Sequence, residues 1–72
     1  DTVVIYYKDK EEESQKIQSV IELAETKIDI HVTEATTMMR NVGFEFPVIS
    51  LSTRLYGYND GMDVLKEIYV SS

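Results

Sequence analysis

The sequence predicts a small α/β domain, and three observations support this prediction. Its 72 residues are near the size at which one apolar core is only just sufficient, so we expect a single domain over residues 1–72. Segments with the apolar spacing of helices alternate with short apolar or β-branched segments typical of strands, in the order β-α-β-α-β-β-α. The sequence contains no cysteine, so the apolar core has to stabilise the fold without disulfide bonds.

The first strand and the first helix are predicted by different patterns. Residues 2–7 are continuously apolar, β-branched or aromatic, as in a central strand that is covered on both faces. Apolar residues then recur at helical spacing, which predicts a helix from about residue 11 to residue 25. These residues are Ile17, Val20, Ile21, Leu23 and Ala24.

Negative charge is concentrated at the predicted start of this helix. Asp9 and Glu12 have the spacing of a capping box, in which the two residues satisfy free N–H groups of the first turn. Glu11 and Glu13 add carboxylates where the helix dipole stabilises each anion by about 0.3 to 1 kcal/mol. Stabilisation of the helix end is the simpler explanation of this run. Presentation of Glu11 as a permanent anion to a basic partner is the functional alternative.

The second strand has the pattern of a sheet edge. Residues 27–33 alternate, with Ile28, Ile30 and Val32 on one side and polar residues on the other, as expected of a half-exposed edge strand. A helix connects this strand to the first one, which predicts that the two strands are parallel. His31 is the only histidine of the chain, so we expect an exposed strand residue and no metal site.

A short helix is predicted next. Residues 33–41 carry apolar residues at helical spacing, and Gly43 is a natural C-terminal stop. We expect Met38 and Met39 of this helix to fill the core rather than to form a recognition surface.

A hairpin and a final helix complete the chain. Residues 48–51 are extended, and a polar turn at residues 52–54 leads into residues 55–56, which predicts a β-hairpin. Asn59 or Asp60 is the expected N-cap of the last helix. The predicted buried side of that helix consists of Met62, Val64, Leu65, Ile68 and Tyr69.

Three short motifs occur in a recognisable order. Residues 3–7 are followed by Lys8, residues 43–48 read Gly-Phe-Glu-Phe-Pro-Val, and residues 56–60 read Tyr-Gly-Tyr-Asn-Asp. Together they resemble the glutaredoxins, and the NrdH-type redoxins in particular, in their first strand, their cis-proline stretch and their Gly-Gly-Tyr-Asp-Asp signature. The resemblance covers essentially the whole chain. It implies a thioredoxin-like (glutaredoxin-type) βαβαββα fold with a mixed four-stranded sheet and three helices.

The resemblance also shows what this chain lacks. Counted from Lys8, Glu11 and Ser14 fall on the two active-site cysteine positions of that family. Thiol–disulfide exchange requires a thiolate, and neither a carboxylate nor a hydroxyl replaces it. The resemblance therefore implies a non-catalytic module with no catalytic residues. Tyr56 is a second departure, because it replaces a glycine that lets a ligand approach closely.

The resemblance further implies a ligand groove. If the Phe46-Pro47 bond is cis, as in the family, the groove accepts an extended peptide, so our main hypothesis is binding of a protein or peptide partner without a cofactor. A glutathione-binding protein is the alternative, in which Lys8, Phe46, Asn59 and Asp60 would make the carboxylate and backbone contacts. The implied groove residues are Lys8, Glu11, Phe46, Pro47, Gly57, Tyr58, Asn59 and Asp60.

The charge of the chain excludes some classes of partner. A net charge of -6 argues against direct binding of nucleic acid or of anionic membranes. A third hypothesis is an acidic decoy that mimics a phosphate backbone. It requires a row of carboxylates on one face, formed by Glu11, Glu12, Glu13, Glu22, Glu25 and Asp29.

Hydropathy and edge strands set the remaining expectations. No apolar run approaches the roughly 20 residues that span a bilayer, so we expect a soluble, cytoplasmic protein. The exposed edge of the second or fourth strand offers a route to pairing, and we expect a monomer or a weak homodimer.

Overall fold

The computed structural model describes residues 2–24 and 29–69. Within these residues the predicted element order is confirmed, with three helices and a mixed four-stranded sheet. The elements are β1 (Thr2–Tyr7), α1 (Ser14–Ala24), β2 (Asp29–Glu34), α2 (Thr37–Val42), β3 (Val48–Leu51), β4 (Arg54–Tyr56) and α3 (Tyr58–Tyr69). None of the helices in these residues is long and apolar enough to cross a membrane.

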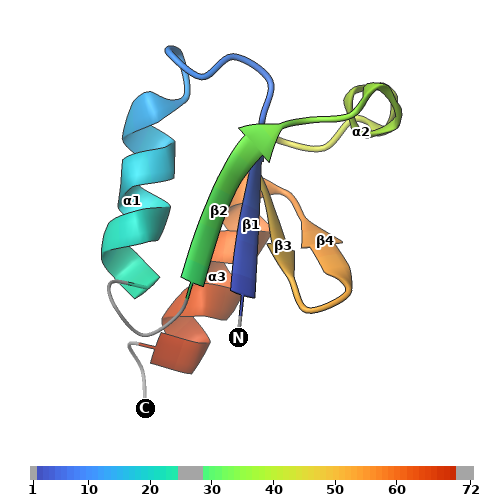
Figure 1. Cartoon of the computed structure of the whole chain (residues 1–72). Coiled ribbons are helices and arrows are strands. Elements are labelled where there is room, and N and C mark those ends of the chain that lie inside the picture. Colours follow the sequence, from blue (N-terminus) through green and yellow to red (C-terminus); the bar gives the residue numbers. More distant parts are fainter. Residues whose placement is uncertain (1, 25–28, 70–72) are drawn as a thin grey trace.

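The sheet has the strand order β2-β1-β3-β4, with β1 in its interior (Figure 1). β2 runs parallel to β1, as predicted, whereas β3 pairs antiparallel with both β1 and β4. Ile5 of β1 lies beside Val32 of β2 and Ile49 of β3, so these three side chains point to the same face. β2 and β4 are the two edge strands.

The core lies mainly between this face and two helices. Val3, Ile5 and Ile49 pack with residues of α1 and α3 in one buried cluster, whose helical members are Ile17, Val20 and Leu65. A smaller cluster of Ala35, Met39 and Val48 lies under α2. Figure 1 shows α2 apart from α1 and α3, near the end of β2. The sheet is therefore covered by two long helices on one side and by one short helix near one end.

Several predicted boundaries are wrong by a few residues. α1 begins at Ser14 rather than near residue 11, because residues 10–13 form turns. α2 begins at Thr37 rather than at residue 33, because β2 continues to Glu34 and the Thr36 hydroxyl caps the helix by accepting from Met39 N at 3.2 Å. The end of α2 at Gly43 is confirmed.

The last helix also begins earlier than predicted. α3 starts at Tyr58, so Asn59 and Asp60 lie inside its first turn and neither is the N-cap. Gly57 holds the preceding position, and its carbonyl oxygen accepts a hydrogen bond from Gly61 N at 2.8 Å. Arg54, predicted in the turn, is the first residue of β4.

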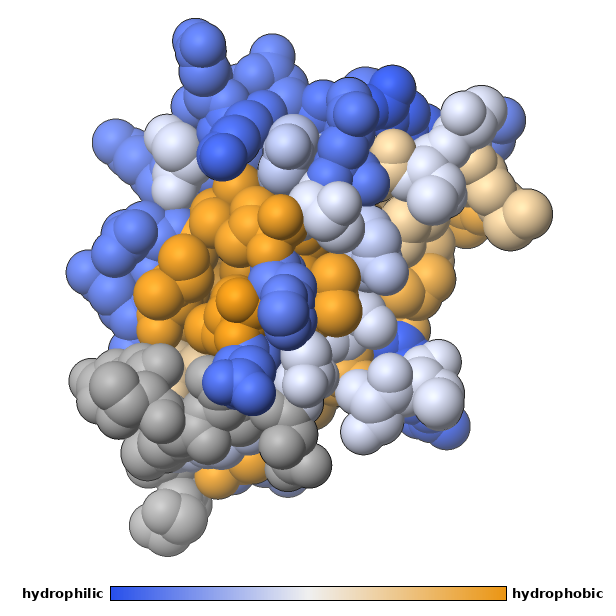
Figure 2. Space-filling model, viewed as in Figure 1, coloured by the Kyte–Doolittle hydropathy of each residue, from blue (hydrophilic) through white to orange (hydrophobic). Residues whose placement is uncertain are grey.

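Three apolar residues are more exposed than predicted. Met38 is 76% exposed, because the six-residue helix α2 buries only Met39. Ile68 is 52% exposed, although it follows Gly61 and Leu65 at helical spacing. It lies near the end of α3, where it borders an open pocket with Thr2 and Leu51. Val32 at the β2 edge is 36% exposed. Figure 2 shows apolar surface over α1 and β2. The predicted Ile28 lies outside the described residues.

Replacing Gly43 with alanine should lower the free energy of unfolding by about 1 kcal/mol. Gly43 has φ of 93°, a left-handed conformation that costs energy for a residue with a Cβ. A Cβ at this position would meet nothing within 4 Å, so the cost is conformational and not steric. Chemical denaturation measures the change. Gly43→Asn should recover part of the loss, since asparagine tolerates this conformation, and an equal loss in both variants would contradict the explanation.

Candidate functional site

The turn between β1 and α1 is organised by one glutamate. Glu13 is only 9% exposed, and its carboxylate accepts hydrogen bonds from Lys8 N at 3.2 Å and from Asp9 N at 2.8 Å. Its own N–H donates to the Asp9 carbonyl at 3.0 Å. Asp9 reciprocates in part, because its Oδ1 accepts from Glu11 N and Glu12 N. The turn is thus closed by carboxylates that bind backbone N–H groups.

This arrangement corrects the predicted capping box. Asp9 accepts from the backbone as expected, but the reciprocal acceptor is Glu13 and not Glu12. The extra residue is accommodated because the chain forms a turn before α1 begins at Ser14. The capping-box spacing predicted Glu12, one residue before the observed Glu13, because it assumes that the helix begins directly after the cap.

Glu11 and Ser14 are both exposed. Glu11 lies in the turn and Ser14 is the first residue of α1, so the positions that match the family's cysteines lie at the start of a helix. Neither residue lines the neighbouring pocket described next. Their side chains face solvent beside that pocket, where no described residue binds them through a hydrogen bond.

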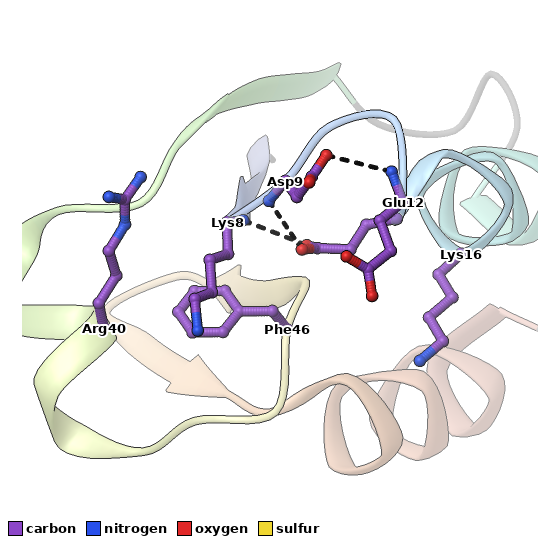
Figure 3. Close-up of a pocket in the computed structure, with 7 residues that line it drawn as sticks. Lys8, Asp9, Glu12, Lys16, Arg40 and Phe46 are labelled. Carbon is purple, nitrogen blue, oxygen red and sulfur yellow. Dashed lines mark hydrogen bonds between the residues drawn. The ribbon is translucent and has the colours of Figure 1, made fainter.

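A pocket of about 540 Å³ lies between this turn, α1, α2 and the loop before β3 (Figure 3). Lys8 and half-buried Phe46, both predicted groove residues, line it. Figure 3 shows Lys8, Phe46 and Glu12 lying between Arg40 of α2 and Lys16 of α1. The complete lining is Lys8, Asp9, Glu12, Glu13, Lys16, Arg40 and Phe46.

The lining of the pocket carries as many basic as acidic residues, although the chain as a whole is acidic. Three of the seven basic residues, Lys8, Lys16 and Arg40, line the pocket, whereas the whole chain has a net charge of -6. Lys16 Nζ also lies 5.2 Å from the ring centroid of Tyr58, and Arg40 forms an ion pair with Glu34 at 2.9 Å. Both cations are thereby oriented by neighbouring elements. This pocket suits a ligand that carries a carboxylate.

The acidic residues of the pocket are less available than its cations. Glu13 is buried against the backbone, and one oxygen of Asp9 accepts from two backbone N–H groups. Glu12 keeps an exposed carboxylate that points toward the pocket in Figure 3. The lining therefore carries three basic and three acidic residues, of which Lys8, Lys16 and Glu12 form no ion pair or hydrogen bond through their charged groups with the described residues.

The other predicted groove residues lie elsewhere. Gly57, Asn59 and Asp60 line a second pocket of about 430 Å³, together with residues 43–45 and 55–56. Pro47 is fully buried, and half-buried Tyr58 lies beside Lys16. The predicted single groove is thus divided into two pockets on either side of the Glu45–Phe46 segment.

Glu45 already occupies the N-terminus of α3. Its Oε1 accepts from Asn59 N at 3.1 Å, and its backbone carbonyl accepts from Tyr58 N at 3.0 Å. A carboxylate of the chain itself therefore takes the N–H of Asn59, one of the residues that the glutathione hypothesis names as contacts. Glutathione would have to displace this side chain to use Asn59.

The loop before β3 presents free backbone groups. The Phe46-Pro47 peptide bond is cis, as the resemblance implies. Among the described residues, no backbone hydrogen bond involves the N–H or the carbonyl of Phe46. Phe46 thus lines the pocket and has backbone groups that the described residues leave without a hydrogen bond.

The remaining candidates contribute little to a site. His31 is exposed on β2, and the described residues hold no group of three or more potential metal ligands. The carboxylate row of the decoy hypothesis is interrupted, because Glu13 is buried and bonded to the backbone. Glu25 of that row lies outside the described residues.

The predicted groove lacked six residues of the site region: Asp9, Glu12, Glu13, Lys16, Arg40 and Glu45. The first three were interpreted as residues of the helix end. Glu13 and Lys16 were within reach of sequence reasoning, since Lys16 lies one helical turn beyond Glu12. Arg40 and Glu45 gave no local signal, because tertiary packing alone brings α2 and the loop before β3 to the turn after β1.

Comparisons of the chain with models of protein families, with curated proteins and with solved structures found no match. The function is therefore argued from the geometry of the site.

Proposed function

We propose that this chain is a redox-inactive, glutaredoxin-like module that binds an extended, acidic peptide segment of a protein partner. The observation that supports this most is the pocket in which Lys8, Lys16 and Arg40 surround Phe46 on an acidic chain. The thioredoxin-like identity of the fold is part of the proposal. The element order and the strand order β2-β1-β3-β4 support it.

Electrostatics favours a ligand with a carboxylate. Ion pairs and charge-assisted hydrogen bonds from lysine and arginine to a carboxylate are stronger than neutral hydrogen bonds. Lys8 lies between Arg40 and Lys16 in Figure 3, so a carboxylate bound at Lys8 has a further cation on either side. Glu12 offers an acceptor to an N–H group of the same ligand. A peptide with an acidic side chain or a free C-terminus supplies both kinds of group.

The backbone of Phe46 favours an extended peptide over a small anion. Its N–H and carbonyl are not used by the described backbone, and Phe46 is one of the residues that line the pocket. An extended peptide forms main-chain hydrogen bonds to such groups, while its side chains enter adjacent pockets. Phe46 also provides an aromatic surface for an apolar side chain of the ligand. An extended peptide can thus form main-chain hydrogen bonds with Phe46 and ion pairs with the lysines and arginine in the same pocket.

Glutathione fits less well. Two of its four expected contacts, Asn59 and Asp60, lie in the second pocket, and Glu45 already accepts a hydrogen bond from the Asn59 N–H. A peptide that uses only Lys8, Arg40 and Phe46 needs no such displacement. The positions of these residues therefore favour an acidic peptide segment over glutathione as the ligand.

Reversing the charge of Lys8 should weaken peptide binding about tenfold. The measurement is a titration of the isotope-labelled chain, followed by amide shifts in NMR, with short N-acetylated acidic peptides that carry a free C-terminus. Glutathione and the C-terminally amidated peptides are separate arms. We expect the shifts to centre on Lys8, Lys16, Arg40 and Phe46, and to weaken in Lys8→Glu because the carboxylate loses its nearest cation.

Lys10→Glu is the matched control. It makes the same charge change two residues away, but Lys10 lies over the Tyr7 ring at 5.9 Å and does not line the pocket. We expect its affinity to stay within about twofold of the unaltered chain. Flat shifts with every peptide, or an equal loss in both variants, would overturn the proposal. Shifts with glutathione alone, extending to Asn59 and Asp60, would replace it with the glutathione alternative.

A further inference from the structure

The outer edge of β2 is unprotected. β2 is an edge strand, and its residues 30–33 (Ile-His-Val-Thr) carry no formal charge at pH 7 in a chain of which 28% is charged. Edge strands usually carry lysine, proline or a bulge that prevents pairing with another strand. The described β2 has neither lysine nor proline, and it pairs with β1 in an unbroken register from Asp29 to Glu34. Its free edge is a regular template for a further strand.

An apolar surface accompanies this edge on the side of α1. Ile30 and Ile21 are half-buried and pack against the main core, and Val32 is 36% exposed. Figure 2, which views the molecule from this side, shows apolar surface over α1 and β2. A strand added to β2 would cover this surface as well as the open backbone. The free hydrogen-bonding edge of β2 and the apolar surface therefore lie next to each other.

We propose that a second copy of this chain adds to β2, so that two β2 strands pair antiparallel about His31. In this register His31 faces His31 of the other copy, and Ile30 faces Val32. Both sheets then continue into one sheet with their helices on the same side, because facing residues in an antiparallel pair point to the same face. Ile30 and Val32 of the two copies form one apolar strip beside α1.

Charge disfavours two of the neighbouring registers. With His31 at the centre, Asp29 faces Thr33, so neither acidic residue of β2 faces an acid. A shift by one residue in one direction places Asp29 opposite Glu34 twice, and like charges directly opposite are destabilising. Centring on Val32 instead places the carboxylate of Glu34 opposite Ile30, on the apolar strip. Among the described residues, the register about His31 has neither fault; centring on Ile30, which places Asp29 opposite His31, is the alternative that the test distinguishes.

The pattern of residues 30–32 also favours a second copy of this chain as the partner that pairs with β2. The sequence Ile30-His31-Val32 presents apolar, polar and apolar residues symmetrically, so one strand satisfies the other without any further partner. The opposite edge offers less, because β4 has three residues and begins with Arg54. The interface is small, so we expect a weak and concentration-dependent dimer.

The test measures the mass of the chain by sedimentation equilibrium from about 10 µM to about 1 mM, a range that covers weak association. Salt of about 0.3 M screens the repulsion between two copies of net charge -6. We expect dimers that form reversibly with concentration. His31→Asp and His31→Lys should each weaken the association about fivefold, because each places two like charges opposite one another.

A mixture of His31→Asp and His31→Lys should restore association to at least the level of the unaltered chain, since opposite charges then face each other. Thr53→Asp and Thr53→Lys are the controls: Thr53 is an exposed residue in the turn between β3 and β4, at the other edge of the sheet. These variants should behave like the unaltered chain, alone and mixed.

Each remaining outcome counts against the proposal. A monomer throughout the concentration range would overturn the dimer. Undiminished dimerisation in both His31 variants would move the interface away from β2. Stronger association of His31→Lys alone would indicate pairing of residue 31 with Asp29, and thus another register. Circular dichroism of each variant shows that a loss of association is not a loss of folding, which is expected because His31 is exposed.

Discussion

Replacing Gly61 with alanine should lower the free energy of unfolding by about 2 kcal/mol, although alanine is the better helix former by about 1 kcal/mol. Gly61 lies in the first half of α3 and is buried against β3. A Cβ at this position would lie 2.8 Å from both Cβ and Cδ1 of Ile49, which is itself fully buried. A change of rotamer can move Cδ1 of Ile49 but not its Cβ, because the position of Cβ is fixed by the backbone. The contact with Cβ therefore remains, and α3 has to move away from the sheet.

Thermal and chemical denaturation measure this effect, and we expect the midpoint of thermal unfolding to fall by roughly 10 °C. Gly57→Ala is the control, because a Cβ there meets Glu45 at 3.5 Å, an ordinary contact. Ile49→Val in the Gly61→Ala background removes only the Cδ1 contact and should recover part of the loss. A stabilised Gly61→Ala variant would show that helix propensity outweighs the contact with Ile49.

The order of helices and strands was largely predictable because buried residues recur in the sequence with the period of the helix or strand that they belong to. Residues 2–7 and 48–51 form strands as their apolar runs predict, and the helical spacing after Ser14 matches the buried face of α1. The ends of elements were less predictable, since individual hydrogen bonds set them. The start of α3 after Gly57 is an example, because Asn59 and Asp60 are the better capping residues by type alone.

The candidate site was predictable only in part. Lys8 and Phe46 were expected together and do line one pocket. Lys16 and Arg40 were not expected there, because their positions depend on how α1 and α2 pack around the turn after β1. The expected groove is divided because the Glu45 side chain reaches across fourteen residues to Asn59 N, and no local pattern encodes a contact of that length.

Replacing Glu13 with alanine should also lower the free energy of unfolding, by about 2 kcal/mol. The substitution removes a buried carboxylate that accepts from Lys8 N and Asp9 N at 3.2 and 2.8 Å. Hydrogen bonds to a charged acceptor contribute about 1.5 to 3 kcal/mol each, and partial access of water to these two N–H groups reduces the sum. Urea denaturation of the variant measures the change.

The neighbouring glutamates provide a sharp comparison. Glu11→Ala and Glu12→Ala remove the same charge one or two residues away, from exposed side chains to which no described N–H donates. If negative charge near the helix dipole were the main effect, the three variants would lose similar stability, within about 0.3 to 1 kcal/mol each. If the hydrogen bonds of Glu13 dominate, Glu13→Ala alone shows the large loss. In that case Glu13→Gln should recover part of it, because the amide keeps one acceptor oxygen for the two N–H groups. A large loss in Glu13→Ala alone therefore means that the acidic run after β1 contains one structural residue, Glu13, which holds the turn and leaves Glu12 exposed at the edge of the pocket.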